Sequence, residues 1–162
     1  MSPAFNPLSK TIAVVRIATA VFFLFFGQYK ITGPGFAHGG FQEYLHGYIA
    51  GSAVGFYRPV LMHVALPNAV FFGYMVGALE IFIGLSLLVG LWVRPASALG
   101  AFYMLNLTLA TWWDPGHGVP FWRYFGNELD HLPLLFLFLI FFAADAGRQW
   151  GLDGRLYIKL TR

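Results

Sequence analysis

Glu80 is the residue of this sequence whose setting most needs a chemical explanation. It is the only charged side chain in an apolar stretch over residues 69–92. A carboxylate at the centre of a bilayer costs about 3 kcal/mol or more, and such groups usually face other protein. At about 100° per residue, Gly73, Gly77 and Gly84 share one face of a helix with Glu80. The spacing therefore predicts that Glu80 points toward a closely packed neighbouring helix rather than toward lipid.

Two groups of polar residues form candidate sites with Glu80. Arg16 and Asn106 form the preferred constellation, in which an Arg16–Glu80 pair is completed by hydrogen bonds from Asn106. This intramembrane polar cluster has two open interpretations, a structural clamp that fixes helix register and a functional site. Lys30 and Tyr103, together with Glu80, are the candidate contacts for a quinone, since a quinone site needs an apolar slot with a few donors. If Glu80 has no partner, burial favours its protonated form.

The histidines offer a weaker site. All five lie in segments predicted outside the membrane interior, and no two have the i, i+4 spacing of a helical ligand pair: His38, His46, His63, His117 and His131. We therefore predict no metal site and interpret these histidines as residues of solvent-exposed loops. The chain has no cysteine, which excludes disulfides, thiol redox chemistry, iron–sulfur clusters and covalent haem attachment.

The composition sets the class of protein that positions these residues. Hydrophobic residues make up 58% and charged residues only 10% of the 162 residues, whereas soluble domains are about 25% charged. The chain is thus predicted to be an all-α integral membrane protein with one domain over residues 1–162. The net charge of +3 has an explanation in membrane topology and does not indicate nucleic-acid binding.

Four segments are predicted to span the bilayer as an antiparallel four-helix bundle, at residues 11–31, 69–92, 96–113 and 129–146. The second and third are joined by a short turn, which makes them antiparallel neighbours. Seven of the ten Lys and Arg residues then lie on the side of both termini. The positive-inside rule predicts that both termini are cytoplasmic.

The loop over residues 32–68 is long for a compact bundle. Phe41, Leu45 and Tyr48 recur at helical spacing opposite Gln42 and His46. This pattern predicts a short helix lying in the outer interface. A second apolar piece, at residues 59–67, is too short to span and is expected to be interfacial or re-entrant.

Three stretches resemble the DoxX family of small four-span membrane proteins of bacteria and archaea. "RIATAVFFLFFGQYKI" resembles its first helix, "GALEIFIGLSLLVGLWVRPASALGAFYML" its central hairpin, and "ADAGRQWGLDGRL" its C-terminal tail. The resemblance implies a location in the cytoplasmic membrane, beside a quinone-using complex. It carries over Arg16, Lys30 and Glu80 as polar family positions without assigning catalytic residues.

Three functions are compatible with these observations. The preferred one is an accessory, mainly structural subunit of a respiratory or photosynthetic electron-transfer complex, with the lipid bilayer and other membrane subunits as partners. The alternative is a quinone-reactive subunit of an oxidoreductase such as a thiosulfate:quinone oxidoreductase, with quinone as the cofactor. Because the chain has no evident electron-accepting centre, electrons would come from a partner or bound cofactor. A small transporter or proton channel is the third class, suggested by the single midplane acid.

Overall fold

Helices account for all the regular structure described in this protein. The computed structural model describes residues 7–33, 35–113, 120, 122 and 128–160, and no strand occurs in these ranges. Two helical stretches within them are long and apolar enough to cross a membrane, Pro7–Thr32 and Arg58–Val89. The prediction of an all-helical chain of membrane character is therefore confirmed.

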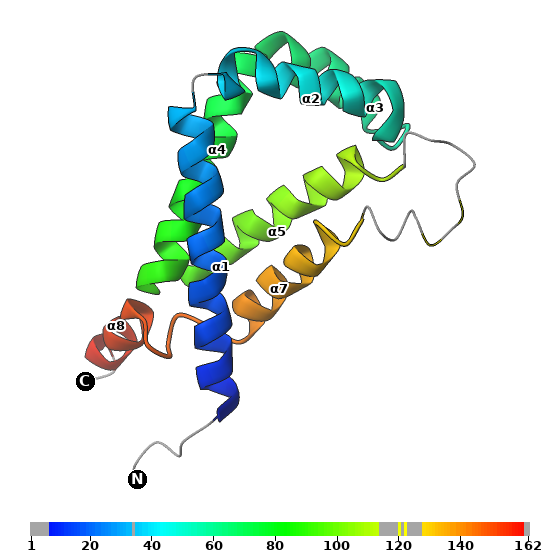
Figure 1. Cartoon of the computed structure of the whole chain (residues 1–162). Coiled ribbons are helices and arrows are strands. Elements are labelled where there is room, and N and C mark those ends of the chain that lie inside the picture. The colour runs from blue at the N-terminus through cyan, green and yellow to red at the C-terminus, as the bar shows by residue number, and fades with distance from the viewer. Residues whose placement is uncertain (1–6, 34, 114–119, 121, 123–127, 161–162) are drawn as a thin grey trace.

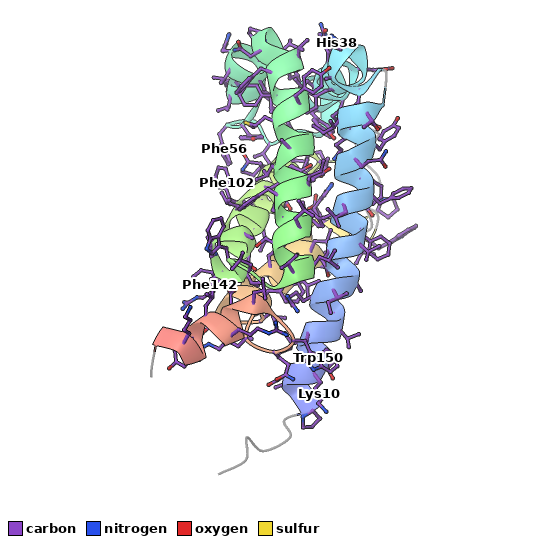
Figure 2. All side chains as sticks on the ribbon, turned by 90° about the vertical axis from the view of Figure 1, so that its left-hand side faces the viewer. Lys10, His38, Phe56, Phe102, Phe142 and Trp150 are labelled. Atoms are coloured by element: carbon purple, nitrogen blue, oxygen red, sulfur yellow. The ribbon has the colours of Figure 1, made fainter. Side chains whose placement is uncertain are left out.

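The first helix pair is formed by α1 (Pro7–Thr32) and α4 (Ala69–Val89), which run antiparallel and side by side (Figures 1 and 2). Their close approach depends on small residues. A Cβ added at Gly84 would lie 2.7 Å from Leu24 Cγ, and one added at Gly27 would lie 2.9 Å from the Ile81 backbone nitrogen. The predicted packing face of α4 is confirmed, because Gly73, Gly77, Glu80 and Gly84 are all buried.

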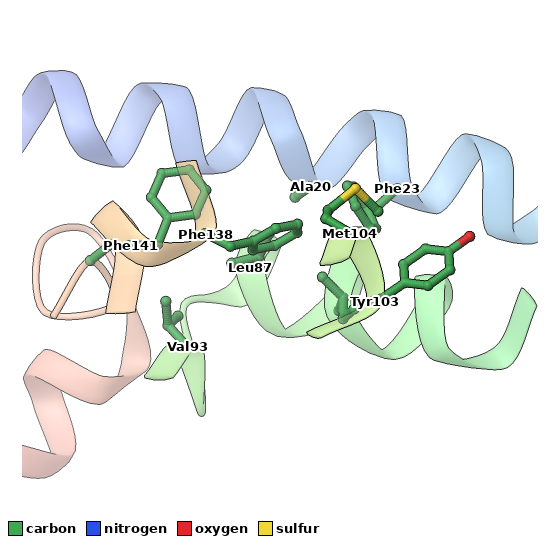
Figure 3. Close-up of a cluster of buried hydrophobic side chains, with 10 residues drawn as sticks. Ala20, Phe23, Leu87, Val93, Tyr103, Met104, Phe138 and Phe141 are labelled. Carbon is green, nitrogen blue, oxygen red and sulfur yellow. The ribbon is translucent and has the colours of Figure 1, made fainter. Parts of the chain in front are cut away.

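The second pair consists of α5 (Val93–Ala110) and α7 (Leu132–Ala143), which are inclined to the first pair in Figure 1. The Phe138 ring of α7 lies against Gly100 of α5, where an added Cβ would come within 2.5 Å of the ring. The same ring meets Phe23 of α1 edge-on, with centroids 5.2 Å apart. Figure 3 shows this apolar cluster, in which side chains of all four helices meet.

Helix ends differ from the predicted spans for local reasons. The stretch predicted at 69–92 ends at Val89, because Gly90 adopts the left-handed conformation (φ 71°, ψ 35°). The stretch predicted at 129–146 is shortened to the 12 residues of α7, with Pro133 in its first turn and Asp145 at φ 48° beyond its end. Twelve residues extend about 18 Å, which is less than a bilayer core of about 30 Å. The length predicted for the fourth helix was therefore wrong.

Residues 35–68 lie across the end of the molecule where α1 finishes, and we call them the outer segment (Figure 1). It contains a π-helical turn at Phe36–Gly40, α2 (Phe41–Gly47), a second π-helical turn at Tyr48–Ser52, α3 (Arg58–Val60), and further helical turns at Leu61–Ala65 and Leu66–Asn68 that lead into α4. The short helix predicted here is confirmed. Its position at a membrane interface stays a prediction.

The outer segment is attached to the end of α5 by backbone and side-chain hydrogen bonds. The Val54 N–H donates to Leu109 O at 2.9 Å, and the Ser52 hydroxyl donates to Ala110 O at 2.8 Å. At the opposite end of the molecule, α8 (Leu152–Leu160) lies near the start of α1, as Figures 1 and 2 show. We call this the α8 end.

Candidate functional site

Glu80 is buried at 5% exposure and forms a three-residue cluster with Lys30 of α1 and Tyr103 of α5. The Lys30 ammonium donates a hydrogen bond to Glu80 Oε1 and pairs with it ionically. The Tyr103 hydroxyl donates to the same oxygen at 2.8 Å. The second oxygen, Oε2, is buried and has no hydrogen-bond partner among the described residues. One carboxylate oxygen thus holds two donors from two different helices.

The local sequence explains why these three side chains can meet. Gly27 lies one turn before Lys30, and a Cβ there would come within 3.0 Å of Glu80 Cβ. Gly77 lies one turn before Glu80, and a Cβ there would be 3.1 Å from Lys30 Cβ. Absence of side chains at both positions brings the α1 and α4 backbones close enough for a lysine to reach the carboxylate.

A cavity of about 1100 Å³ adjoins the cluster between α1, α5 and the outer segment, and Lys30 and Tyr103 line it. Besides Tyr103, seven aromatic residues line it, namely Phe25, Phe26, Tyr29, Phe36, Phe41, Tyr44 and Tyr48. The Lys30 ammonium is 5.6 Å from the Phe36 ring centroid, a cation–π distance. Figure 3 shows the Tyr103 hydroxyl directed away from the apolar cluster. The cavity therefore combines flat apolar walls with donors at one point.

Further polar groups border this cavity, among them Glu43, Tyr48, Ser52 and His131. His131 precedes α7, and its Nδ1 is 3.1 Å from the Thr111 hydroxyl. Tyr48 comes from the outer segment, where burial, followed by the neighbouring Tyr44, raises the pKa of its hydroxyl. Tyr48 is therefore neutral at physiological pH and remains a hydrogen-bond donor.

The predicted Arg16–Glu80 pair is wrong. Arg16 and Lys30 are separated by 14 residues of α1, about 21 Å along the helix axis, and Lys30 occupies the place next to Glu80. Arg16 is instead fully buried at the α8 end. It donates to Leu87 O at 2.6 Å, near the C-terminus of α4, where a cation is favoured by the helix dipole.

Arg16 also holds the chain that leads into α8. Its second terminal nitrogen lies 3.4 Å from Gln149 O and 3.3 Å from Trp150 O. Asp153 completes this junction, because its carboxylate accepts the backbone N–H groups of Trp92 and Val93 at 2.9 and 3.0 Å. This capping starts α5 at Val93, three residues before the start that the sequence predicted. Arg16 thus connects α1 to the end of α4 and to the chain that precedes α8.

Asn106 is also not a partner of Glu80. Its side-chain oxygen accepts a hydrogen bond from the Tyr57 hydroxyl at 2.5 Å, and its amide nitrogen donates to Phe102 O at 2.7 Å. Asn106 therefore fixes the outer segment to α5. Of the predicted site residues, the structure brings together Lys30, Glu80 and Tyr103, and it places Arg16 and Asn106 elsewhere.

The histidines do not gather at one place among the described residues. His38 hydrogen-bonds the Tyr74 hydroxyl at 3.0 Å at the outer end, while His131 lies by the cavity. His117 lies outside the described residues. Sequence reasoning missed the roles of His131, Tyr57 and Asp153. The Leu152–Asp153 pair of the C-terminal stretch was the one available signal for the last of these.

Glu128 is a second buried acid, at 6% exposure, and neither of its oxygens has a partner among the described residues. Burial, with a smaller effect from the charge of Asp130, raises the pKa of Glu128 from 4.5 to about 7. The folded protein therefore binds a proton that the unfolded chain has lost between these pH values. We expect stability to fall as the pH rises from about 5 through about 7, where the folded protein releases this proton.

Replacing Glu128 by glutamine should remove this part of the pH dependence. The measurement is the thermal unfolding midpoint in mild detergent across the same pH range. Glu43→Gln is the matched control, because Glu43 is exposed and should leave the slope unchanged. If the unfolding midpoint changes with pH equally in Glu128→Gln and in the unaltered protein, the pKa of Glu128 is not raised.

Comparison with known proteins identifies the family. The family model described as DoxX matches residues 11–113, a range that contains most of α1 and all of the outer segment, α4 and α5, and that covers more than half of the chain. The matched range includes Lys30, Glu80 and Tyr103. Comparison with curated proteins and comparison with solved structures each gave no match. The resemblance seen in the sequence is confirmed, and the chain belongs to the DoxX family.

Proposed function

We propose that this protein is a quinone-binding membrane subunit of an oxidoreductase, and that the head group of the quinone binds in the cavity beside Lys30 and Tyr103. The observation that carries the proposal is the chemistry of that cavity. Its aromatic walls suit a flat ring, and its donors converge at the Glu80 cluster. Its volume of about 1100 Å³ leaves room for a ring and the first part of an isoprenoid chain.

Each residue of the cluster has a distinct part in the proposal. Lys30 has three N–H donors and uses one on Glu80, so it can also donate to a quinone carbonyl oxygen. The Tyr103 hydroxyl has one proton, which turns from Glu80 Oε1 to the quinone when the ring binds, because Lys30 still bonds that carboxylate oxygen. Glu80 does not line the cavity; it holds both donors in place from behind through Oε1. A quinone supplies two-electron, two-proton chemistry when bound, and the electrons come from a partner subunit or its cofactor. The chain's own residues bind and orient the ring.

The proposed setting is a single membrane domain over residues 1–162 in the cytoplasmic membrane, with both termini cytoplasmic. In this arrangement α5 and α7 also cross the bilayer as the third and fourth members of a bundle. Because α7 is shorter than the bilayer core, the residues that flank it and local thinning of the bilayer make up the difference. The antiparallel order of α1, α4, α5 and α7 supports this topology, since it puts the start of α1 and α8 at the same end (Figure 1).

An accessory structural role is the second candidate and is compatible with quinone binding. The observation that favours it is the row of exposed aromatic side chains on α1, namely Phe22, Phe25, Phe26 and Tyr29. Phe25, Phe26 and Tyr29 border the cavity, and all four rings lie on a membrane-length helix. Such a surface suits contact with a neighbouring membrane subunit as well as with lipid.

Binding of decylubiquinone to the purified protein tests the proposal. We expect saturable binding in detergent, measured by isothermal titration calorimetry, and a loss of affinity of about fivefold in Tyr103→Phe, the value of one hydrogen bond of about 1 kcal/mol. Lys30→Met should lose more, because a charged donor forms the stronger hydrogen bond.

Tyr74→Phe is the matched control for the hydroxyl. It removes one Tyr O–H that bonds His38 and lies outside the cavity lining, so affinity should be unchanged. Absence of saturable binding, or equal affinities in Tyr103→Phe and Tyr74→Phe, would refute a quinone site at this position.

A further inference from the structure

A second cavity lies at the α8 end, remote from the Glu80 cluster, and its chemistry differs from that of the first. Its volume is about 610 Å³, and its lining includes Val89, Arg148, Trp150, Gly151, Leu152 and Arg155. It is thus formed by the last turn of α4, the chain after α7 and the first turns of α8 (Figure 1). Two arginines face an otherwise small and apolar wall.

The two arginines are held differently. Arg148 is oriented by Asp145, whose carboxylate lies 2.8 Å from its Nη2, and by the Tyr157 ring, whose centroid is 4.3 Å from its guanidinium carbon. Arg155 is exposed and forms no ion pair among the described residues. Asp145 is shared with Arg94 at 3.4 Å. The cavity therefore has one fixed cation and one cation without a counter-charge.

Asp153, two residues before Arg155 in the sequence, forms no salt bridge with it among the described residues. Its two carboxylate oxygens accept the backbone N–H groups of Trp92 and Val93. The backbone around the cavity is also tightly constrained. Trp150 has φ 53°, and a Cβ added at Gly151 would lie 2.2 Å from Gly147 O. The cationic wall is consequently a defined shape and not a flexible tail.

The cavity adjoins the surface that faces lipid in a membrane protein. Val89 is 46% exposed and continues the exposed apolar face of α4 that includes Phe82 and Leu85. Trp150 is 57% exposed, as expected of an indole at a membrane–water interface. The amphipathic α8 adds Leu156 and Tyr157, which are also exposed. An occupant of this cavity can therefore extend an acyl chain along α4.

We propose that the cavity between Arg148 and Arg155 binds the phosphate of an anionic phospholipid, whose acyl chains lie along the exposed face of α4. A guanidinium pair suits phosphate because each presents a planar fork of N–H donors. Basic pockets beside membrane helices are suited to such head groups. Inorganic phosphate shares the charge but gains nothing from the apolar surface at Val89. This proposal is independent of the quinone site.

Native mass spectrometry of the purified full-length protein tests the proposal. Dioleoyl phosphatidylglycerol should remain bound at lipid concentrations at which dioleoyl phosphatidylcholine does not. Arg155→Gln should weaken phosphatidylglycerol binding by about fivefold, the effect of one interfacial cation. Lys159→Gln is the matched control, since it removes the same charge from the same helix but does not line the cavity. It should bind phosphatidylglycerol nearly as the unaltered protein does.

Three results would overturn the proposal. Equal losses in Arg155→Gln and Lys159→Gln would show general charge attraction instead of a site. Equal retention of the two lipids would show that the anionic head group is not recognised. Displacement of phosphatidylglycerol by millimolar inorganic phosphate would identify a free-anion site. Arg155→Lys keeps the charge and should retain most of the binding. The unfolding midpoints of Arg155→Lys and Arg155→Gln, compared with that of the unaltered protein, show whether a loss of binding comes from a loss of fold.

Discussion

Replacing Glu80 by glutamine should destabilise the folded protein by on the order of 3 kcal/mol, the cost of removing one member of a buried ion pair. Glutamine has nearly the same shape but no charge, so it leaves the Lys30 ammonium without its counter-ion. The Lys30 side chain is 18% exposed and lines the cavity, so the unpaired ammonium would be only partly accessible to solvent. Thermal and denaturant unfolding in mild detergent measure the effect.

A double-mutant cycle separates the pair from the rest of the environment. Lys30→Met in the Glu80→Gln background removes the unpaired ammonium, so the double variant should be more stable than Glu80→Gln alone. Tyr103→Phe should cost about 1 kcal/mol, because Lys30 still occupies the same carboxylate oxygen. If Glu80→Gln unfolds at the temperature of the unaltered protein, the ion pair does not stabilise the fold.

Replacing Arg16 by methionine should destabilise the α8 end by a comparable amount, on the order of 3 kcal/mol. The guanidinium bonds the carbonyl of Leu87 and reaches those of Gln149 and Trp150, and methionine cannot replace any of these hydrogen bonds. The carbonyls would lie beside a buried apolar side chain, which is unfavourable unless water enters. Hydrogen exchange over residues 144–160 should therefore accelerate more than exchange in α4.

Arg58 provides the matched control for Arg16. Its guanidinium also bonds backbone carbonyls, those of Ala53 and Gly51, but in the outer segment. Arg58→Met should raise exchange in the outer segment and leave α8 unaffected. Arg16→Lys keeps the charge and should recover only part of the stability, because one ammonium cannot span the same carbonyls as a planar fork. If hydrogen exchange of α8 is unchanged in Arg16→Met, Arg16 does not hold α8 in place.

Much of the helical pattern was available from the sequence because it depends on local periodicity. The apolar runs predicted α1, α4 and α5 within a few residues, and the glycines at 73, 77 and 84 predicted the buried face of α4. The helix ends were less predictable. Gly90 ends α4 by a local conformation, whereas the start of α5 depends on Asp153, which lies 60 residues later.

The sequence by itself determined that Glu80 faces protein, since helical phase assigns each side chain to a face. It also named the polar groups to consider, which are Arg16, Asn106, Lys30 and Tyr103. Only the tertiary structure decided which of them meet. Phase along one helix does not fix the axial offset between two helices, and that offset depends on where glycines let the backbones approach. Here the contacts of Gly27 and Gly77 place Lys30 beside Glu80. The same offset leaves Arg16 about four turns away, at the carbonyl end of α4.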